Sequence, residues 1–437
     1  MKSLSGRNSI IVAATLFSMF FGAGNLILPP LVGAYAGDVS LIAGAGFMIS
    51  AIGLPILGVV ASALSGSLAE IASRVSEKFS YLYVMLIYLT IGPFLAIPRT
   101  SSTSFEMLVP LLPEDTNILL VSVCFSVAFF AVAFTLALHP NKLVDVLGKV
   151  SAPALIALIV VLVGAAILAP TAPAMPVRAP YESDAMIEGF VAGYQTMDLL
   201  AALNFGLVIA MNIRELGVTD SHDVAREIVR SGILAGLLMF AIYMGLTYVG
   251  TTTATLVPDA TNGAVLLVAS AQDHFGVMGN VLVAAIFLIA CLNVCISLIS
   301  CCSEYFSETF PKVSYRSWAV LFTVFSCVVS NVGLSKIIAF SVPLLSALYP
   351  ISIVLVLFGL VSKQVDKYPA IWKTAVLTAV FFGVVTSARA TFAPKAVLPL
   401  IDSLPGAEFG LAWVLPVLVS IVVGWLISYV SQRKQQA

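Results

Sequence analysis

The sequence predicts an all-α polytopic membrane protein with twelve transmembrane helices, which form a single domain over residues 1–437. Hydrophobic residues make up 60% of the chain and charged residues only 10%, and the mean hydropathy is +1.06. Soluble domains carry about 25% charged residues, so lipid must solvate most of this surface. The alternation of apolar and polar residues in units of about ten, typical of a transmembrane β-barrel, is absent.

Twelve segments reach the roughly 20 mostly apolar residues that a transmembrane helix needs. They cover residues 9–36, 40–66, 80–105, 117–138, 143–169, 186–212, 225–255, 277–308, 315–332, 335–361, 369–388 and 408–430. The first follows Lys2 and Arg7 and so has the outline of a secretory signal peptide. It is too long for one, and it runs into Pro29 and Pro30 instead of a small-residue cleavage site. We therefore expect it to be the first membrane helix.

The distribution of Lys and Arg predicts that both termini are cytoplasmic. With the N-terminus inside, 16 of the 21 basic residues fall on the inner side, namely Lys2, Arg7, Arg74, Lys78, Lys142, Lys149, Arg214, Arg226, Arg230, Lys312, Arg316, Lys363, Lys367, Lys373, Arg433 and Lys434. The outer side receives Arg99, Arg178, Lys336, Arg389 and Lys395. Such an excess of cytoplasmic basic residues is the positive-inside rule.

Several classes of function are disfavoured. The longest hydrophilic stretches are the loops 171–185, 213–224 and 389–407, and 257–276 is expected to form a short helix at the outer surface. These leave no room for a nucleotide-binding or soluble output domain, and neither a P-loop nor an H-E-x-x-H motif occurs. The six cysteines lie in apolar segments and are interpreted as packing residues. We expect no enzyme, no ATP-driven pump, no cofactor and no nucleic-acid partner.

Two predicted helices are interrupted by glycine and polar residues. In the first helix the interruption is Phe-Gly-Ala-Gly-Asn at 21–25, and in the sixth it is Gly-Tyr-Gln-Thr-Met-Asp at 193–198. Unwound backbone at membrane depth is tolerated only where it lines a cavity or binds a ligand. Matching breaks in two halves indicate the binding site of a transporter built from inverted repeats. The predicted repeats are helices 1–5 (9–169) and 6–10 (186–361), with helices 11 and 12 (369–430) peripheral.

The chemistry of these breaks suits a charged small molecule. Gly22 and Gly24 permit an unwound backbone, half-helix N-termini offer N–H groups to an anion, and Asn25 adds an amide oxygen. Asp198 is an ionisable group near the middle of a span, where no Lys or Arg is expected at comparable depth. It could bind a cation, carry a proton or cap the second half of helix 6. The alternative is that Gly22 and Gly24 form a helix-packing contact and that Asn25 forms a hydrogen bond between helices.

Two further segments have candidate functional residues. In helix 8, Asn293, Ser297 and Ser300 share one face, and their oxygens suit a hard cation such as sodium. They could equally bond the helix to its neighbours. In helix 3, Arg99 is predicted at the outer boundary, where it would either reach lipid headgroups or belong to an outer gate.

Four motifs carry a resemblance to a known family. They are GAGNLILPPLVG (22–33), IGPFLAIPRTSSTSFE (91–106), GYQTMDLLAALNFGLVIAMNIRELG (193–217) and CLNVCISLISCCSEYF (291–306). The chain resembles, over nearly its whole length, the bacterial branched-chain amino acid carrier family, the leucine/isoleucine/valine:cation symporters. The resemblance implies a LeuT-type 5+5 inverted repeat in the bacterial inner membrane and import of leucine, isoleucine or valine with Na⁺ or H⁺. The alternative is a symporter of the same fold for another amino acid or a nucleobase.

The resemblance also implies where the ligands bind. The candidate substrate-binding residues are Gly22, Ala23, Gly24, Asn25, Ile97, Thr100, Tyr194, Thr196, Met197 and Asp198. The candidate cation-binding residues are Ser18, Phe21, Asn293, Ser297 and Ser300. Beyond a possible Na⁺ no metal is expected, and beyond the substrate, the monovalent cation and the lipid bilayer no obligatory partner is expected.

Overall fold

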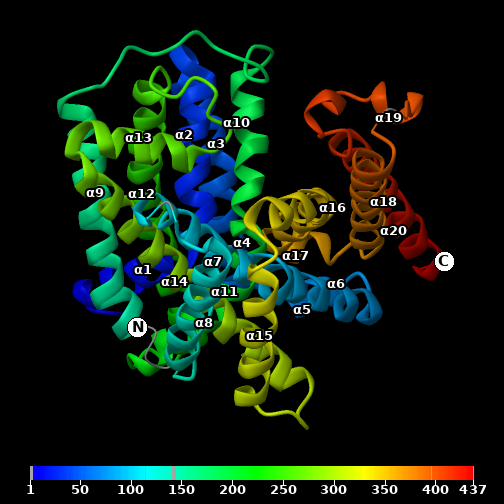
Figure 1. Cartoon of the computed structure of the whole chain (residues 1–437). Helices are drawn as coiled ribbons and strands as arrows, with labels where there is room; N and C mark the ends of the chain where they lie inside the picture. The colour runs from blue at the N-terminus through cyan, green and yellow to red at the C-terminus, as the bar shows by residue number, and fades with distance from the viewer. Residues whose placement is uncertain (1–2, 114, 140–143, 395, 437) are drawn as a thin grey trace.

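The computed structural model describes residues 3–113, 115–139, 144–394 and 396–436, and within these ranges the regular structure is helical (Figure 1). Lys2, Lys142 and Lys395, which contribute to the predicted charge bias, lie outside the described residues. So does residue 143, at the start of the predicted fifth segment.

The first half of the chain forms ten α-helices. They are α1 (Gly6–Phe20), α2 (Ala23–Ala36), α3 (Ser40–Met48), α4 (Leu54–Ser65), α5 (Leu68–Ser73), α6 (Glu77–Leu89), α7 (Ala96–Glu106), α8 (Ile118–Ala137), α9 (Ala152–Leu168) and α10 (Ala185–Gly193). π-Helical turns at Ile49–Gly53 and Thr90–Phe94 join α3 to α4 and α6 towards α7, and another at Val144–Ser151 leads into α9. Short 3₁₀ turns occur at Gly37–Val39 and Val109–Leu111.

The second half forms the remaining helices. They are α11 (Asp198–Glu215), α12 (Ser221–Thr253), α13 (Gly263–Phe275), α14 (Val277–Thr309), α15 (Tyr315–Ser330), α16 (Leu334–Leu360), α17 (Ser362–Val365), α18 (Ala370–Phe392), α19 (Pro399–Asp402) and α20 (Val414–Gln436). 3₁₀ turns lie at Tyr194–Thr196 and Ala407–Phe409. The 13-residue α13 is too short to cross a bilayer and coincides with the helix predicted within 257–276.

Each of the twelve predicted segments contains helix in the described ranges. By length and composition, nine helices there could cross a membrane, or ten if α10 and α11 count as one bent span. The shorter α1 and α15, of 15 and 16 residues, are not among them. The structure therefore supports an all-helical polytopic protein with nine or ten apolar spans.

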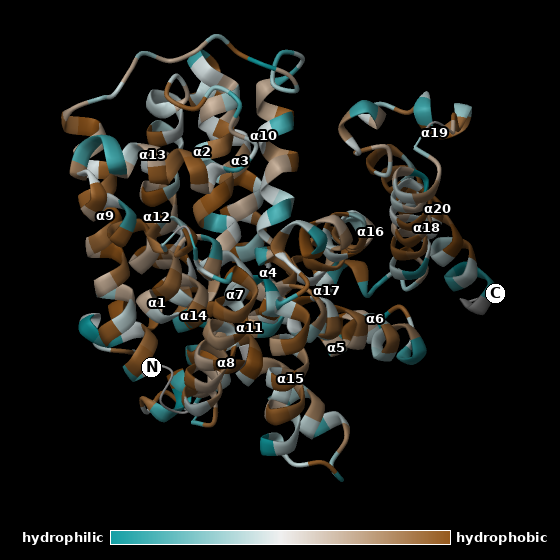
Figure 2. Ribbon diagram, in the orientation of Figure 1, coloured by the Kyte–Doolittle hydropathy of each residue, from teal (hydrophilic) through white to brown (hydrophobic). Residues whose placement is uncertain are grey.

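The apolar side chains divide between the interior and the outer surface. α14 and α16 are mostly buried, whereas α8, α9, α18 and α20 expose most of their apolar length. Figure 2 shows hydrophobic colouring along these outer helices, with hydrophilic residues mainly in loops and at helix ends. An exposed surface of this kind suits contact with lipid tails.

Glycine brings several helices into close contact at the centre. A Cβ added to Gly250 of α12 would lie 2.5 Å from the carbonyl carbon of Pro30 in α2. One added to Gly189 of α10 would lie 2.8 Å from the carbonyl carbon of Ala43 in α3. Small residues at such contacts let helix backbones approach within a membrane.

The predicted helix 3 is broken in the middle. Gly92 has non-helical dihedral angles (φ −88°, ψ −122°), and Pro93 follows it. Proline removes a hydrogen bond from the helix interior and clashes with the preceding turn. α7 therefore begins as a separate helix at Ala96.

The two C-terminal spans lie to one side of the bundle (Figure 1). α18 packs on α16 and on α20, while α20 packs chiefly on α18. α18 and α20 thus contact the other described helices mainly through α16.

Candidate functional site

Both predicted helix breaks are present, and they face each other. α1 ends at Phe20, Gly22 is extended (φ −125°, ψ −156°), and α2 begins at Ala23. α10 and α11 are bent by 52° around the turn Tyr194–Thr196 and Met197. Met197 has a φ of 69°, a left-handed conformation that is uncommon for a residue other than glycine. The N-termini of α2 and α11 both open onto the space between the breaks.

Asn25 links the two breaks through its side chain. Its Oδ1 accepts a hydrogen bond from the backbone N–H of Gly22 at 3.0 Å, which closes the first turn of α2. Its Nδ2 donates to Oδ2 of Asp198 at 2.5 Å and also to the hydroxyl of Tyr243 on α12. All three side chains are buried. The network fixes the unwound part of the first predicted helix to that of the sixth.

A small cavity of about 40 Å³ lies between the breaks, enough for about three water molecules. Its polar wall comes from the two unwound segments and α7, and its apolar wall from α1, α11 and α14. The lining residues are Met19, Phe20, Gly22, Ala23, Gly24, Asn25, Ile91, Ala96, Arg99, Thr100, Thr196, Met197, Asp198, Ala201, Phe205, Val294 and Leu298. Position 24 has little room for a side chain, since a Cβ there would lie 2.8 Å from Nη2 of Arg99 and 3.3 Å from Cα of Thr196.

Most of the predicted substrate-binding residues are brought together by this cavity. Its lining includes Gly22, Ala23, Gly24, Asn25, Thr100, Thr196, Met197 and Asp198. Ile97 and Tyr194 do not line it. Ile97 is fully buried in the core, and the ring of Tyr194 stacks on Tyr349 of α16, with centroids 4.6 Å apart.

The expected position of Arg99 is wrong. The sequence predicted it at the outer boundary, yet it lines the central cavity together with Asp198. The expectation that no basic residue lies at the depth of Asp198 is wrong for the same reason. The break at Gly92 and Pro93 sets the course of α7, so counting residues along an unbroken helix misplaces everything after it. Pro93, inside an apolar segment, is the feature of the sequence that indicates this break.

The predicted cation-binding residues lie outside this cavity and have other partners. Ser18 donates to the carbonyl of Leu147 at 3.4 Å, and Ser151 donates to Oδ1 of Asn293 at 2.5 Å. Within α14, Ser297 and Ser300 donate to the carbonyls one turn earlier, at 2.8 and 2.9 Å. In the described part of the chain no hydrogen bond joins Ser18 or Phe21 to the three α14 residues. Their cation-binding role stays a prediction.

A second, larger cavity of about 510 Å³ lies at the other end of α11. It is bordered by the end of α4, by α5, α6, α11 and α12 and by the end of α14, and Glu70, Arg214 and Glu308 are among its lining residues. Asn204, six residues after Asp198 on α11, also lines it. Arg214 belongs to the predicted cytoplasmic set, so this cavity opens on the side expected to face the cytoplasm.

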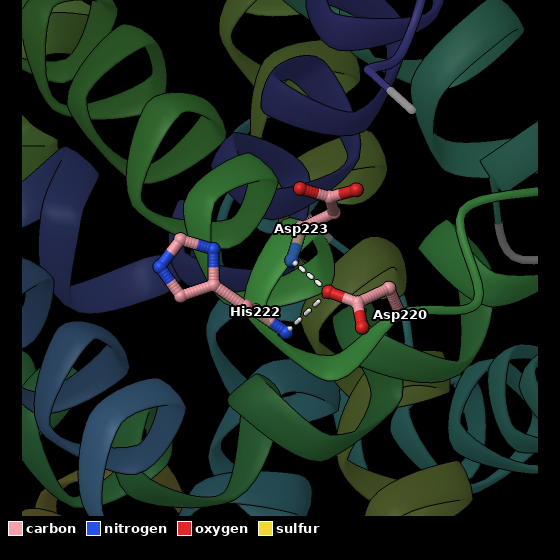
Figure 3. Close-up of side chains that lie close together, drawn as sticks. All are labelled: Asp220, His222 and Asp223. Carbon is pink, nitrogen blue, oxygen red and sulfur yellow. Dashed lines mark hydrogen bonds between the residues drawn. The ribbon is translucent and has the colours of Figure 1, made fainter. Parts of the chain in front are cut away.

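One group of side chains has the composition of a metal site. Asp220, His222 and Asp223 have potential ligand atoms within 4.8 Å of one another at the start of α12. Figure 3 shows one carboxylate oxygen of Asp220 accepting the backbone N–H groups of His222 and Asp223, at 3.0 and 3.1 Å. Asp220 is thus the N-cap of α12, which explains the group without a metal.

A family model and individual relatives match this chain over nearly its whole length. Residues 5–431 match the family described as branched-chain amino acid transport protein. The chain is 35% identical to the branched-chain amino acid permease BraB of Bacillus subtilis, covering 99% of this chain and 98% of that protein. It is 37% identical to the branched-chain amino acid transport system 2 carrier protein of Pseudomonas aeruginosa, covering 97% and 96%.

Solved structures of transporters have a similar fold. One is a nucleobase-cation-symport-1 family transporter in a closed conformation with bromovinylhydantoin bound, at 14% identity, with a TM-score of 0.60 over 97% of this chain and 93% of that one. Another is MhsT in complex with L-phenylalanine, at 16% identity, with a TM-score of 0.58 over 99% of both chains. At these identities the likeness concerns the fold alone.

Proposed function

Because the chain belongs to the branched-chain amino acid transport protein family, we propose that it imports leucine, isoleucine and valine into a bacterial cell by cation-coupled symport. Its relatives are named permeases and carrier proteins, so the chain is a transporter and not an enzyme. It operates in the inner membrane, with both termini in the cytoplasm.

The cavity between the two helix breaks is the observation that carries the proposal. Its polar part includes unwound backbone, half-helix N-termini, the carboxylate of Asp198 and the guanidinium of Arg99. Its apolar part includes Phe20, Phe205 and Leu298. A site with both kinds of wall suits a small molecule with a charged head and an aliphatic tail.

Transport proceeds by alternating access in a LeuT-type 5+5 inverted repeat of ten helices, to which two further helices are appended. The central cavity, of about 40 Å³, is too small for leucine and must expand to admit it. The larger cavity beside Arg214 supports a conformation that faces the cytoplasm. Rocking of one helix group against the other then exposes the central site to the outside.

A monovalent cation, Na⁺ or H⁺, drives the import. For Na⁺, the carbonyls near Ser18 and Phe21 and the oxygens of Asn293, Ser297 and Ser300 supply the hard ligands that the ion prefers. For H⁺, Asp198 is the buried carboxyl group that can take up and release the proton. Neither assignment requires a resident cofactor.

Uptake of labelled leucine, isoleucine and valine into proteoliposomes tests this function. An imposed sodium gradient, an imposed proton gradient and no gradient are compared in parallel. Accumulation under one gradient, with mutual competition among the three amino acids, is the expected result and identifies the coupling ion. No accumulation by folded, inserted protein under any gradient would discard the substrate assignment, and a screen of other amino acids and nucleobases would follow.

A further inference from the structure

The guanidinium of Arg99 lies at the central cavity and has no hydrogen-bond or ion-pair partner among the described residues. It is half-buried and lines that cavity, next to Gly24. Within residues 3–113, 115–139, 144–394 and 396–436 its side chain forms neither a hydrogen bond nor an ion pair. A guanidinium has five N–H donors in a fixed planar fork, and leaving them unpaired in a membrane interior is costly. The residue is therefore set up to receive an anion.

The carboxylate of Asp198 lines the same cavity but does not neutralise Arg99 by direct contact. Asp198 accepts a hydrogen bond from Asn25, and no ion pair joins it to Arg99 in the described structure. A pair that served only to balance charge would be expected in contact, because each charge is costly to bury alone. Two opposite charges held apart on one cavity wall match a ligand that carries both charges.

We propose that Arg99 receives the carboxylate of the transported amino acid, and that Asp198 receives its ammonium group. This inference rests on the proposed function and names the chemical feature that the site selects, which is the zwitterion. Arginine binds a carboxylate with two parallel hydrogen bonds. Gly24 belongs to the first turn of α2, whose backbone N–H groups are a second set of donors for the same carboxylate.

The apolar wall then receives the side chain of the substrate. Phe20, Phe205, Val294 and Leu298 surround the space that the charged head group does not fill. Since Arg99 and Asp198 have opposite formal charges, a bound zwitterion leaves the net charge of the site at zero. A carboxylic acid without an amino group, or an amine without a carboxylate, leaves one protein charge unpaired.

Competition by leucine analogues tests the proposal directly. Binding of labelled leucine to purified full-length protein is competed with leucine, with leucinamide, which lacks the carboxylate, and with isocaproate, which lacks the amino group. At about pH 6 the amino group of leucinamide stays charged. The wild type is expected to bind each analogue at least about thirtyfold more weakly than leucine, because one charged partner is left unpaired. Equal binding of leucinamide and leucine would overturn the proposal.

Variants assign each charge to its residue. In Arg99→Gln the ratio of the affinity for leucine to that for leucinamide should fall towards one. The ratio of the affinity for leucine to that for isocaproate should stay high. Asp198→Asn should show the opposite pattern, and Arg99→Lys should keep part of the preference over leucinamide. A loss of affinity by the same factor for all three compounds in Arg99→Gln would mean a structural role only and would overturn the proposal.

Controls separate folding from recognition. Arg433→Gln alters an exposed arginine that lies over the ring of Tyr429 on α20. It should leave the affinities for leucine, leucinamide and isocaproate in the same ratios as in the wild type. If Arg99→Gln does not elute as a folded species, the double variant with Asp198→Asn removes both charges together and should lose both preferences. If folded wild type binds no branched-chain amino acid, the proposed function fails. The same analogue comparison with alanine and phenylalanine then still tests whether the site selects a zwitterion.

Discussion

The amide nitrogen of Asn25 lies 2.5 Å from a carboxylate oxygen of Asp198, although 173 residues separate them in the chain. The contact joins the start of α2 to the start of α11, the two half-helices that open onto the central cavity. Neither break is thus an independent loop, and the position of one depends on the other.

Asn25→Ala should strongly reduce uptake while the protein still folds. The substitution removes the acceptor for Gly22 N–H and both bonds to Asp198 and Tyr243, so the breaks lose their common anchor. We expect leucine uptake to fall at least about tenfold, since small displacements of a positioned group are costly. Asn117→Ala is the matched control, because it removes a comparable side-chain bond at the exposed start of α8 and costs about 1 kcal/mol of stability. Unchanged uptake by Asn25→Ala would contradict the prediction.

Gly24→Ala should impair transport through contact with Arg99. The new methyl group would lie 2.8 Å from the guanidinium and 3.3 Å from Cα of Thr196, so one of them must move. A displacement of about 1 Å in a binding site can lower the rate about a hundredfold. Gly164→Ala in α9 is the control, because an added Cβ would meet no packing neighbour within 4 Å and alanine is the better helix former. The initial rates of leucine uptake by the two variants are compared. Equal rates would contradict the prediction.

Val294→Ala should relax the selection for side-chain size. Val294 lines the cavity, and its Cγ2 would be 2.8 Å from a Cβ on Gly22, so it limits the space there. A methylene in an apolar pocket is worth about 1–3 kcal/mol of discrimination, or about 10- to 200-fold. We expect methionine and phenylalanine to become better competitors of leucine uptake. Val281→Ala, at an exposed position of the same helix, should change nothing. An unaltered order of competitors in Val294→Ala would show that Val294 does not set the size limit.

Asp198→Asn should impair uptake driven by the cation gradient. The buried carboxylate is expected to take part in binding the driving ion or the substrate head group, and the amide keeps its size without its charge. Accumulation driven by the gradient should fall at least tenfold, or about 1.4 kcal/mol or more. Asp145→Asn, which alters an exposed carboxylate paired with Lys149, serves as the control. Full, still cation-dependent uptake by Asp198→Asn would remove the residue from the mechanism.

Gly250→Ala should destabilise the fold. Its Cβ would lie 2.5 Å from the carbonyl carbon of Pro30, so α2 and α12 must separate. Overpacking of this kind costs about 1–3 kcal/mol, which should lower the thermal unfolding midpoint in detergent by several degrees. Gly232→Ala lies on the same helix, and its nearest neighbour is Ile56 Cγ2 at 3.8 Å. Equal midpoints for the two variants would show that the contact is not tightly packed.

The helix breaks were predictable because they depend on local chemistry. Glycine, proline and polar residues interrupt an apolar run, and the structure has unwound backbone at both places. The tertiary consequences were not predictable in the same way. The link between Asn25 and Asp198 and the position of Arg99 depend on how distant helices pack. A hydropathy pattern predicts how deep a residue lies in the membrane only if the helix is straight. The predicted depth therefore becomes less accurate after each kink.

The side-chain oxygens of α14 illustrate a second limit. The spacing of Asn293, Ser297 and Ser300 places them on one face, and that much follows from the sequence. Hydroxyl groups inside a helix also bond to the carbonyl one turn earlier, as Ser297 and Ser300 do here. The positions of these residues therefore fit both a cation site and ordinary hydrogen bonding within the helix. A measurement of ion binding separates the two interpretations.

The lateral position of α18 and α20 has a practical use. They contact the rest of the protein mainly through α16, and none of their residues lines the central cavity. A fluorescent protein or purification handle joined after α20 leaves the ligand-facing atoms unaltered. Cysteine labels placed on the exposed face of α20 likewise provide fixed reference points for single-molecule distance measurements, against which movements of α1 and α11 are followed during turnover.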